Sequence, residues 1–417
     1  MRSSLFGAAL GATVAALCAA PMAHASTLTP IYGFCKQTDC LDGFGPEFPV
    51  TFDSAGNLYG VTTNNGTKGT SILYELKNNA GTWTQKTLFQ FCAAGTTCHK
   101  GSVPTGRVAV DPAGNVFGVT LHGNDLSSND GVLYEVTAKG DYAEQDKFCD
   151  PNCEANGGRP TFGLTWLNAD AGAPFPNTGG AGLVGTASGG GAGGTGTLYS
   201  TFVNGHGVVQ ISPFNGLIPE DMIEAAATGP TGIFFTTFSV QHGGLYQVVT
   251  GGATKVWTFC AAESKCNEGS DLGMFTVDGN GNFFGTTTRN AKKNSGAIWE
   301  LTAPHYKKVK VVHAFCTAKN CADGGGGGTY FGFPMARDAT GNVYGVTTNG
   351  GKQNAGTIFR IGADGKYARL YDFCALASCA DGSGPLGGLT IDAAGNLYGT
   401  TFGGGPLGHG EVFEFTP

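Results

Sequence analysis

A ten-residue motif that recurs along the chain constrains the fold more than any other feature. Five clear copies share an Asp-x-x-Gly-Asn start, and they read DSAGNLYGVT from Asp53, DPAGNVFGVT from Asp111, DGNGNFFGTT from Asp278, DATGNVYGVT from Asp338 and DAAGNLYGTT from Asp392. The interval between the second and third copies has room for two decayed ones, GLVGTA from Gly182 and GIFFTT from Gly232. Seven copies at a spacing of about 56 residues predict one supersecondary unit used seven times.

Each unit is expected to contain four short strands, A to D. In the unit that starts near Glu47, β-branched and aromatic residues predict a strand ending at Phe52–Asp53 and strands over Asn57–Thr63, Ser71–Lys77 and Lys86–Cys92. The Asp-x-x-Gly-Asn segment is predicted to be the A to B turn, because Asp accepts turn N–H groups while Gly and Asn tolerate left-handed backbone. Four strands in about 40 to 60 residues are typical of a propeller blade.

The two ends of the chain are expected to meet in one blade. The last unit has strands A to C at Gly387–Asp392, Asn396–Thr401 and Gly410–Phe415 but no strand D, whereas Leu28–Cys35 matches the D strands of other units. The predicted fold is therefore all-β, a seven-bladed β-propeller with four-stranded blades in which the N-terminal strand completes the last blade. Aromatic residues in strand C are expected to pack between blades, at Tyr74, Tyr134, Tyr199, Tyr246, Trp299, Phe359 and Phe413.

The repeated D-x-x-G-N-L-Y-G-T-T core resembles the GloVer (choice-of-anchor) tandem repeat of exported bacterial proteins across nearly all of residues 28–417. More distantly it is similar to NHL-type and streptogramin-lyase-like β-propellers. The resemblance implies a propeller fold and export, and it supplies no catalytic residues. The third and fourth units depart from the motif.

The first residues predict a signal peptide. Met1-Arg2 is followed by the apolar run Leu5–Cys18 and by Ala23-His24-Ala25, so we expect residues 1–25 to be removed and residues 26–417 to form a single propeller domain. The protein would be periplasmic or extracellular, and no later apolar run is long enough for membrane insertion. A net charge of -7 without a basic stripe excludes nucleic acid as a natural partner. The 71 glycines then indicate tight turns, since 41% hydrophobic residues can still form a large core.

Twelve cysteines after the leader fall into six close pairs, which in an exported chain predict disulfides. The expected pairs are Cys35–Cys40, Cys92–Cys98, Cys149–Cys153, Cys260–Cys266, Cys316–Cys321 and Cys374–Cys379. No metal site is expected, because each pair stands alone and only Cys98 has an adjacent histidine.

Strand order places the D to A and B to C loops on one side of a propeller, and all six cysteine pairs lie in D to A loops. We call this side the stapled face and the opposite side, which carries the A to B turns, the turn face. Loops on a rigid scaffold often carry function. Candidate ligand-binding residues in the B to C loops of the stapled face are Asn64, His122, Ser239, Arg289 and Asn349. They would bind a sugar or peptide by hydrogen bonds, or they are turn residues that face water.

A second ring of residues follows the cysteine pairs. It contains Asp42, Lys100, Asn156, Glu268, Asp323 and Asp381. Its acids would attract a cation or a basic ligand, so an axial cation stays open although no cofactor is expected. The alternative is that Asp-Gly is an ordinary turn pair here.

No nucleophile elbow, zinc-binding helix or phosphate loop is present in the sequence. The candidate catalytic residues are His122, His242 and His409, with Arg289 and Glu268, in an elimination reaction. The favoured function is a non-enzymatic, monomeric scaffold that binds an extracellular polymer, in particular a polysaccharide, or a protein. The alternatives are a polysaccharide lyase or glycoside hydrolase with its site at the axial mouth of the stapled face, and a purely structural protein without a pocket.

Overall fold

A computed structural model gives the fold of the chain. It describes residues 26–63, 71–91, 100–123, 131–149, 158–167, 182–190, 196–202, 209–210, 222–229, 232–238, 243–249, 252–260, 268–278, 280–289, 295–325 and 334–417. The predicted leader, residues 1–25, lies outside them. Within the described residues no helix is long and apolar enough to cross a membrane.

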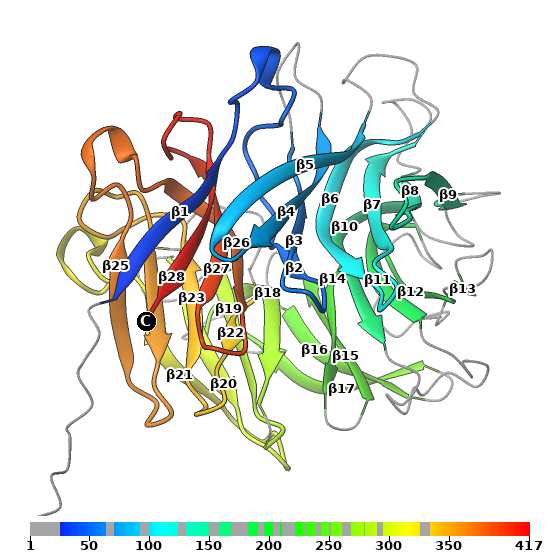
Figure 1. Cartoon of the computed structure of the whole chain (residues 1–417). Coiled ribbons are helices and arrows are strands. Elements are labelled where there is room, and N and C mark those ends of the chain that lie inside the picture. The colour runs from blue at the N-terminus through cyan, green and yellow to red at the C-terminus, as the bar shows by residue number, and fades with distance from the viewer. Residues whose placement is uncertain are drawn as a thin grey trace, which may run out of the picture.

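The structure is all-β, and most of its strands form four-stranded antiparallel sheets whose strands follow chain order (Figure 1). One contains β2 (Thr51–Phe52), β3 (Leu58–Val61), β4 (Ile72–Asn79) and β5 (Thr82–Gln90). The next contains β14 (Met222–Gly229), β15 (Gly232–Phe238), β16 (Gly243–Val249) and β17 (Gly252–Phe259). A third contains β18 (Ser270–Val277), β19 (Phe283–Arg289), β20 (Ala297–Leu301) and β21 (Val309–Ala314). A fourth contains β22 (Ala336–Arg337), β23 (Val343–Thr347), β24 (Thr357–Ile361) and β25 (Tyr367–Asp372).

One sheet has eight strands where separate blades were expected. It joins β6 (Ser102–Val110), β7 (Val116–His122), β8 (Val132–Val136) and β9 (Tyr142–Lys147) to β10 (Gly158–Leu167), β11 (Gly182–Gly189), β12 (Thr197–Phe202) and β13 (Val209–Gln210). The junction is a single parallel pairing between Arg107 and Gly163. Glycine permits this approach, because a Cβ atom at Gly163 would lie 2.1 Å from the Arg107 nitrogen.

The predicted joining of the chain ends is confirmed. β1 (Thr27–Gly33) pairs antiparallel with β28 (Glu411–Thr416) and completes the sheet of β26 (Ser383–Ile391), β27 (Leu397–Gly403) and β28. The pairing runs from Thr27 opposite Thr416 to Gly33 opposite Glu411. Figure 1 shows β1 in blue beside β28 in red.

Strand ends differ from the sequence prediction most clearly in the first unit. β4 and β5 extend to a hairpin whose two central residues, Ala80 and Gly81, have φ values of 52° and 88°. Such left-handed backbone at both positions allows a tight two-residue turn, so both strands continue where the sequence predicted a longer loop.

The repeated aspartate forms the A to B turn as predicted. Asp392 Oδ1 accepts hydrogen bonds from the backbone N–H groups of Ala394 (2.9 Å) and Asn396 (2.8 Å), and Oδ2 accepts one from Asn396 Nδ2 (3.0 Å). The same three kinds of bond occur at Asp53, Asp111, Asp278 and Asp338. The motif therefore specifies a turn.

The glycine late in the motif lies beneath the strand C aromatic. Gly345 is opposite Phe359 in the β23–β24 pairing, and a Cβ atom on Gly345 would lie 2.4 Å from the ring. The same pairing joins Gly60 to Tyr74, Gly118 to Tyr134, Gly185 to Tyr199, Gly285 to Trp299 and Gly399 to Phe413. In the decayed fourth unit Phe235 replaces the glycine, and its ring stacks on Tyr246 with centroids 5.3 Å apart.

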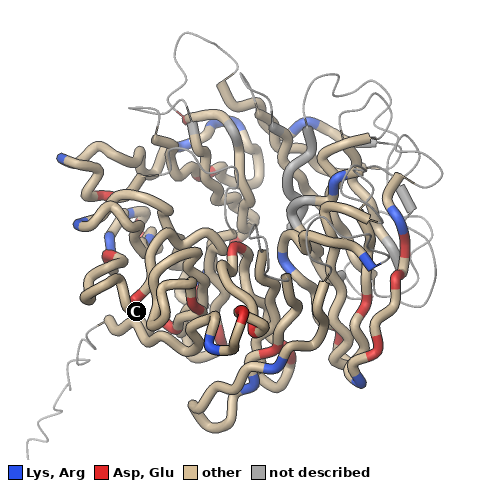
Figure 2. Tube along the Cα trace, turned by 90° about the horizontal axis from the view of Figure 1, so that it is seen from above, with Lys and Arg blue, Asp and Glu red and all other residues tan. Residues whose placement is uncertain are grey.

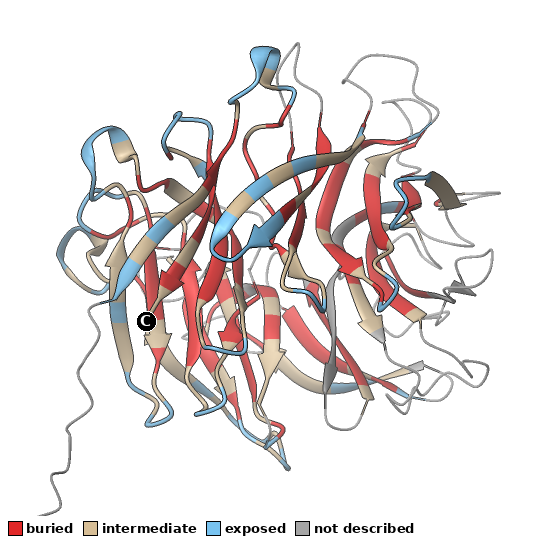
Figure 3. Cartoon of the chain, viewed as in Figure 1, coloured by how far each residue is buried: buried red, intermediate tan, exposed pale blue. Residues whose placement is uncertain are grey.

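These aromatics also pack between sheets, as predicted. Tyr74 belongs to a buried cluster with Val412 and Tyr398 of the last sheet, and Tyr134 to one with Tyr59 of the preceding sheet. Figure 3 shows the buried residues along the inner strands, whereas exposed residues lie on the loops and along β1 and β5. Acidic and basic residues are scattered over the described trace rather than gathered in one patch (Figure 2).

Candidate functional site

The predicted disulfides are confirmed where both cysteines are described. Cys35–Cys40, Cys316–Cys321 and Cys374–Cys379 are bonded, each in a D to A loop. A short 3₁₀ helix ends at each second cysteine: η1 (Thr38–Cys40), η3 (Lys319–Cys321) and η4 (Ala377–Cys379). Cys149 and Cys260 are also disulfide-bonded. Their expected partners Cys153 and Cys266, and the pair Cys92–Cys98, lie outside the described residues.

The aspartate that follows each of these three disulfides closes its own loop. Asp381 Oδ2 accepts hydrogen bonds from Ala375 N (2.8 Å) and Tyr371 Oη (2.7 Å), and Oδ1 accepts one from Leu376 N (3.0 Å). Asp42 and Asp323 bind the equivalent loop N–H groups. These contacts favour the turn interpretation of the acidic ring. Among the described residues, no three His, Cys, Asp or Glu side chains gather where they could hold a metal ion.

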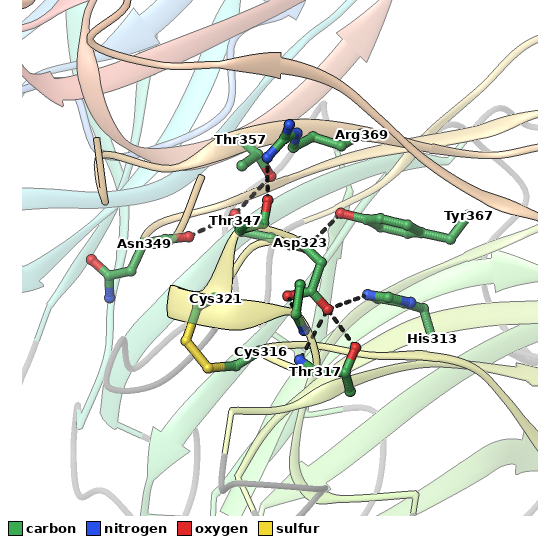
Figure 4. Close-up of polar contacts among 12 residues, drawn as sticks. His313, Cys316, Thr317, Cys321, Asp323, Thr347, Asn349, Thr357, Tyr367 and Arg369 are labelled. Carbon is green, nitrogen blue, oxygen red and sulfur yellow. Dashed lines mark hydrogen bonds and ion pairs between the residues drawn. A yellow bond between two sulfur atoms is a disulfide. The ribbon is translucent and has the colours of Figure 1, made fainter. Parts of the chain in front are cut away.

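His313 contacts Asp323 in the way that Tyr371 contacts Asp381 in the last stapled loop. His313 Nε2 lies 3.2 Å from Asp323 Oδ2, and the imidazole stacks on the Tyr367 ring with centroids 3.7 Å apart (Figure 4). Burial lowers the pKa of His313, although the Asp323 carboxylate opposes this change. Hydrogen bonds from Thr317 and Ala318 outweigh burial at Asp323 and lower its pKa. The histidine is thus part of the loop structure.

A buried carboxyl group lies beneath the last stapled loop. Glu411 begins β28, its side chain is fully buried, and within the described chain neither carboxyl oxygen has a hydrogen-bond partner. The position is occupied by Ile72, Val132 and Thr357 in other units. Burial, followed by the charge of Asp381, raises the pKa of Glu411 to about 8.

The predicted ligand-binding ring is described in part. Asn349 pairs through its backbone with Gly325, which follows the Cys316–Cys321 loop, with N–O distances of 2.8 and 3.2 Å. His122 is the last residue of β7, and Arg289 is the last residue of β19. Asn64 and Ser239 lie outside the described residues. Asn349 is thereby placed against a stapled loop (Figure 4).

The candidate catalytic residues come from different sheets. Glu268 Oε1 accepts a hydrogen bond from Cys260 N (3.3 Å), and its carbonyl accepts one from Thr287 Oγ1 (3.0 Å). His409 is exposed, its ring lies 6.2 Å from that of Phe44, and its carbonyl accepts a bond from Gly45 N (2.9 Å). His242 lies outside the described residues. Glu268 and His409 are therefore each engaged with their own neighbours.

A pocket of about 430 Å³ lies beside the stapled Cys374–Cys379 loop, which contributes Ala375 to its lining. Arg369, Lys352, Tyr371, Asp372 and Ala375 contribute to its lining. The Asp372 carboxylate lies 3.2 Å from Arg369 Nη1 and 3.7 Å from Lys352 Nζ. Arg369 also donates a hydrogen bond to the carbonyl of Ala322, which follows the preceding stapled loop. Two cations, one acid and a tyrosine thus share one depression, a combination that can bind hydroxyl and carboxylate groups.

Sequence reasoning missed Arg369, Asp372 and Lys352. Arg369 and Asp372 lie in strand D just before Cys374, and Lys352 comes three residues after the predicted Asn349. Their closeness in the sequence to a paired cysteine and to a predicted loop residue could have indicated these residues. The order of strands alone does not show which of these side chains meet.

Together these features define an all-β repeat protein with propeller-like four-stranded sheets. Residues 231–417 match the Gloeobacter/Verrucomicrobia repeat family. The match confirms the GloVer resemblance there. No curated protein matches the chain.

Two solved structures have a similar fold. Puromycin hydrolase superposes with a TM-score of 0.53 and 12% identity over 93% of this chain, and the chain spans only 55% of that protein's length. The polysaccharide lyase Uly1 gives a TM-score of 0.51 and 11% identity over 89% of this chain and 90% of its own. At such identities the similarity concerns the fold alone.

Proposed function

We propose that this chain is an exported seven-bladed β-propeller that binds an extracellular polymer, in the first place a polysaccharide, through its stapled face. The seven-blade count treats the eight-stranded sheet as two blades, β6–β9 and β10–β13, which share only the Arg107–Gly163 pairing. Export is supported by the disulfides, which persist in oxidising compartments. N-terminal sequencing of the secreted product tests cleavage before Ser26.

The observation that carries the binding function is the pocket beside the Cys374–Cys379 loop. Its volume, about 430 Å³, is within the range of small-ligand sites. The Cys374–Cys379 loop at its edge is fixed by its disulfide and by hydrogen bonds to Asp381, so binding there requires little ordering of this backbone. A pocket of this size also disfavours the purely structural alternative.

Binding is tested with a glycan array on the purified mature protein, followed by titration of the best ligand. We expect Arg369→Gln to abolish binding and Lys352→Gln to weaken it by about twofold to fivefold, because an exposed charge contributes up to about 1 kcal/mol. Lys77→Gln, an exposed lysine at the end of β4 outside both pockets, is the matched control. If no glycan binds and a protein partner is recovered instead, a polysaccharide is excluded as the ligand.

The second candidate is a polysaccharide lyase or glycoside hydrolase with its site at the axial mouth. Exposure of His409 on the stapled face favours it, since a general base must reach its substrate. Incubation with acidic polysaccharides would give products with new ultraviolet absorbance for a lyase or new reducing ends for a hydrolase. Loss of that activity in His409→Ala, with unchanged thermal stability, is expected for this candidate; absence of both products rules it out.

A further inference from the structure

A separate pocket of about 380 Å³ lies on the turn face, between the sheet β18–β21 and the sheet β22–β25. Its walls come from the A to B turns of both sheets, at Asn280 and Thr340, and from the turn around Asp364. None of its lining residues lies in a stapled loop. It is therefore distinct from the pocket beside Arg369 and independent of the function proposed for it.

Arg337 is the unusual residue of this pocket. It ends β22, its Nε atom is buried, and within the described chain neither a hydrogen bond nor an ion pair satisfies its guanidinium group. The residue before the motif aspartate is apolar in the other clear units, namely Phe52, Val110, Val277 and Ile391. A partly buried guanidinium without a partner is costly unless an anion supplies the missing bonds.

The acidic residues of the pocket already make hydrogen bonds or ion pairs with other residues. Asp278 accepts bonds from its own turn. Glu300 Oε2 lies 2.8 Å from Lys310 Nζ, and Asp364 Oδ2 lies 2.8 Å from Lys366 Nζ. Arg337 is therefore the cation of the pocket that has no acidic partner among the described residues.

Three apolar residues contribute to the lining of the pocket. Phe284, Val343 and Ile361 line it and are almost completely buried, with exposed fractions of 9%, 1% and 2%. An aromatic ring under a polar rim matches a sugar ring, which has apolar C–H faces and hydroxyl edges. The guanidinium fork matches a planar carboxylate.

We propose that this turn-face pocket binds an acidic sugar unit, with the carboxylate on Arg337 and the sugar ring against Phe284. The unit is either a free uronic acid or a uronic acid residue within a polymer, and the two sources share this chemistry. The exposed Asn280 amide at the rim is positioned to contact a ring hydroxyl.

The test is titration of the purified mature protein with glucuronate, galacturonate, their oligomers and glucose, followed by calorimetry or ligand-observed NMR. We expect an acidic sugar to bind about tenfold or more tightly than glucose, and Arg337→Gln to remove that difference. Binding of monosaccharides assigns a free uronic acid, whereas binding of oligomers alone assigns a polymer unit; both support the proposal.

Two variants separate this site from the stapled face. Lys352→Gln should leave acidic-sugar binding at the turn face unchanged, and Asn280→Ala, in an exposed turn, should weaken it without lowering thermal stability. Equal binding of glucose and glucuronate, or full retention of the preference in folded Arg337→Gln, would overturn the proposal. Should Arg337→Gln fail to fold, Arg337→Lys and Asn280→Ala decide: unchanged affinity in both overturns it.

Discussion

The ring of Phe373 packs edge-on against the ring of Phe413, with centroids 5.3 Å apart. Phe373 directly precedes the stapled Cys374, whereas Phe413 lies in β28 of the next sheet. The same contact joins Phe34 to Tyr74, Phe91 to Tyr134, Phe148 to Tyr199, Phe259 to Trp299 and Phe315 to Phe359. Each staple therefore begins at the residue after an inter-sheet aromatic contact.

Phe373→Ala should lower the free energy of unfolding by about 3 to 5 kcal/mol, because a fully buried ring is lost from a junction between sheets. Urea unfolding followed by circular dichroism measures the change. Phe402→Ala is the control, since that ring is 44% exposed. Equal losses in both variants would contradict the role given to the junction.

Gly345→Ala should lower the free energy of unfolding by about 1 to 3 kcal/mol, because the added methyl group collides with the buried ring of Phe359. Gly325→Ala is a matched control in the neighbouring loop, where the nearest atom to an added Cβ is 3.8 Å away. Thermal unfolding of both variants tests the pair. A smaller loss in Gly345→Ala than in the control would show that the aromatic ring can move aside.

The stability of the folded chain should fall as the pH rises from about 4.5 to about 8 because of Glu411. The pKa of this carboxyl is raised from 4.5 to about 8 in the folded chain, so the folded state holds a proton that the unfolded state releases. Its stabilising contribution is complete below the unfolded pKa and is lost as the pH rises through the folded pKa, by at most about 1.4 kcal/mol per pH unit.

Glu411→Gln should remove this dependence and raise the melting temperature most above pH 8. Melting curves between pH 5 and pH 9 provide the measurement, and Glu414→Gln in the same strand is the control. Parallel curves for wild type and Glu411→Gln would show that the carboxyl does not titrate in this window.

Removal of one staple should be tolerated. The double variant Cys316→Ser, Cys321→Ser should lose about 2 kcal/mol or less of its free energy of unfolding. The loss is small because the disulfide closes a short loop and Asp323 still binds the loop N–H groups. Chemical unfolding measures the loss, and non-reducing peptide mapping checks all six predicted pairs. Long-range pairs in the map, or complete unfolding of the double variant, would refute the local role of the staples.

The sequence predicted those parts of the fold that depend on local or repeated information. The aspartate turns, the strand C aromatics and the pairing of Leu28–Cys35 with the last unit all follow from comparison of the repeats. The sequence also predicted that the strand C aromatics pack between sheets, but it did not predict the residues that they contact there. The Phe373–Phe413 contact and the Arg107–Gly163 junction depend on how one sheet is oriented against the next, which strand order alone does not specify.

The candidate site was predicted less completely for the same reason. Asn349 lies beside a stapled loop as the loop order implied, but the pocket depends on Arg369 spanning from β25 to the carbonyl of Ala322. His313 was not among the candidate residues, and its pairing with Asp323 is consistent with a structural role.

The β1–β28 pairing has a consequence for biosynthesis. The ribosome makes β28 long after β1, so β1 has no partner until the strands between them have been synthesised. During that time β1 presents an open edge, which favours wrong partners. Secretion of the chain before folding, with closure of the last sheet outside the cytoplasm, would bring both ends and the oxidising conditions for the staples together in time.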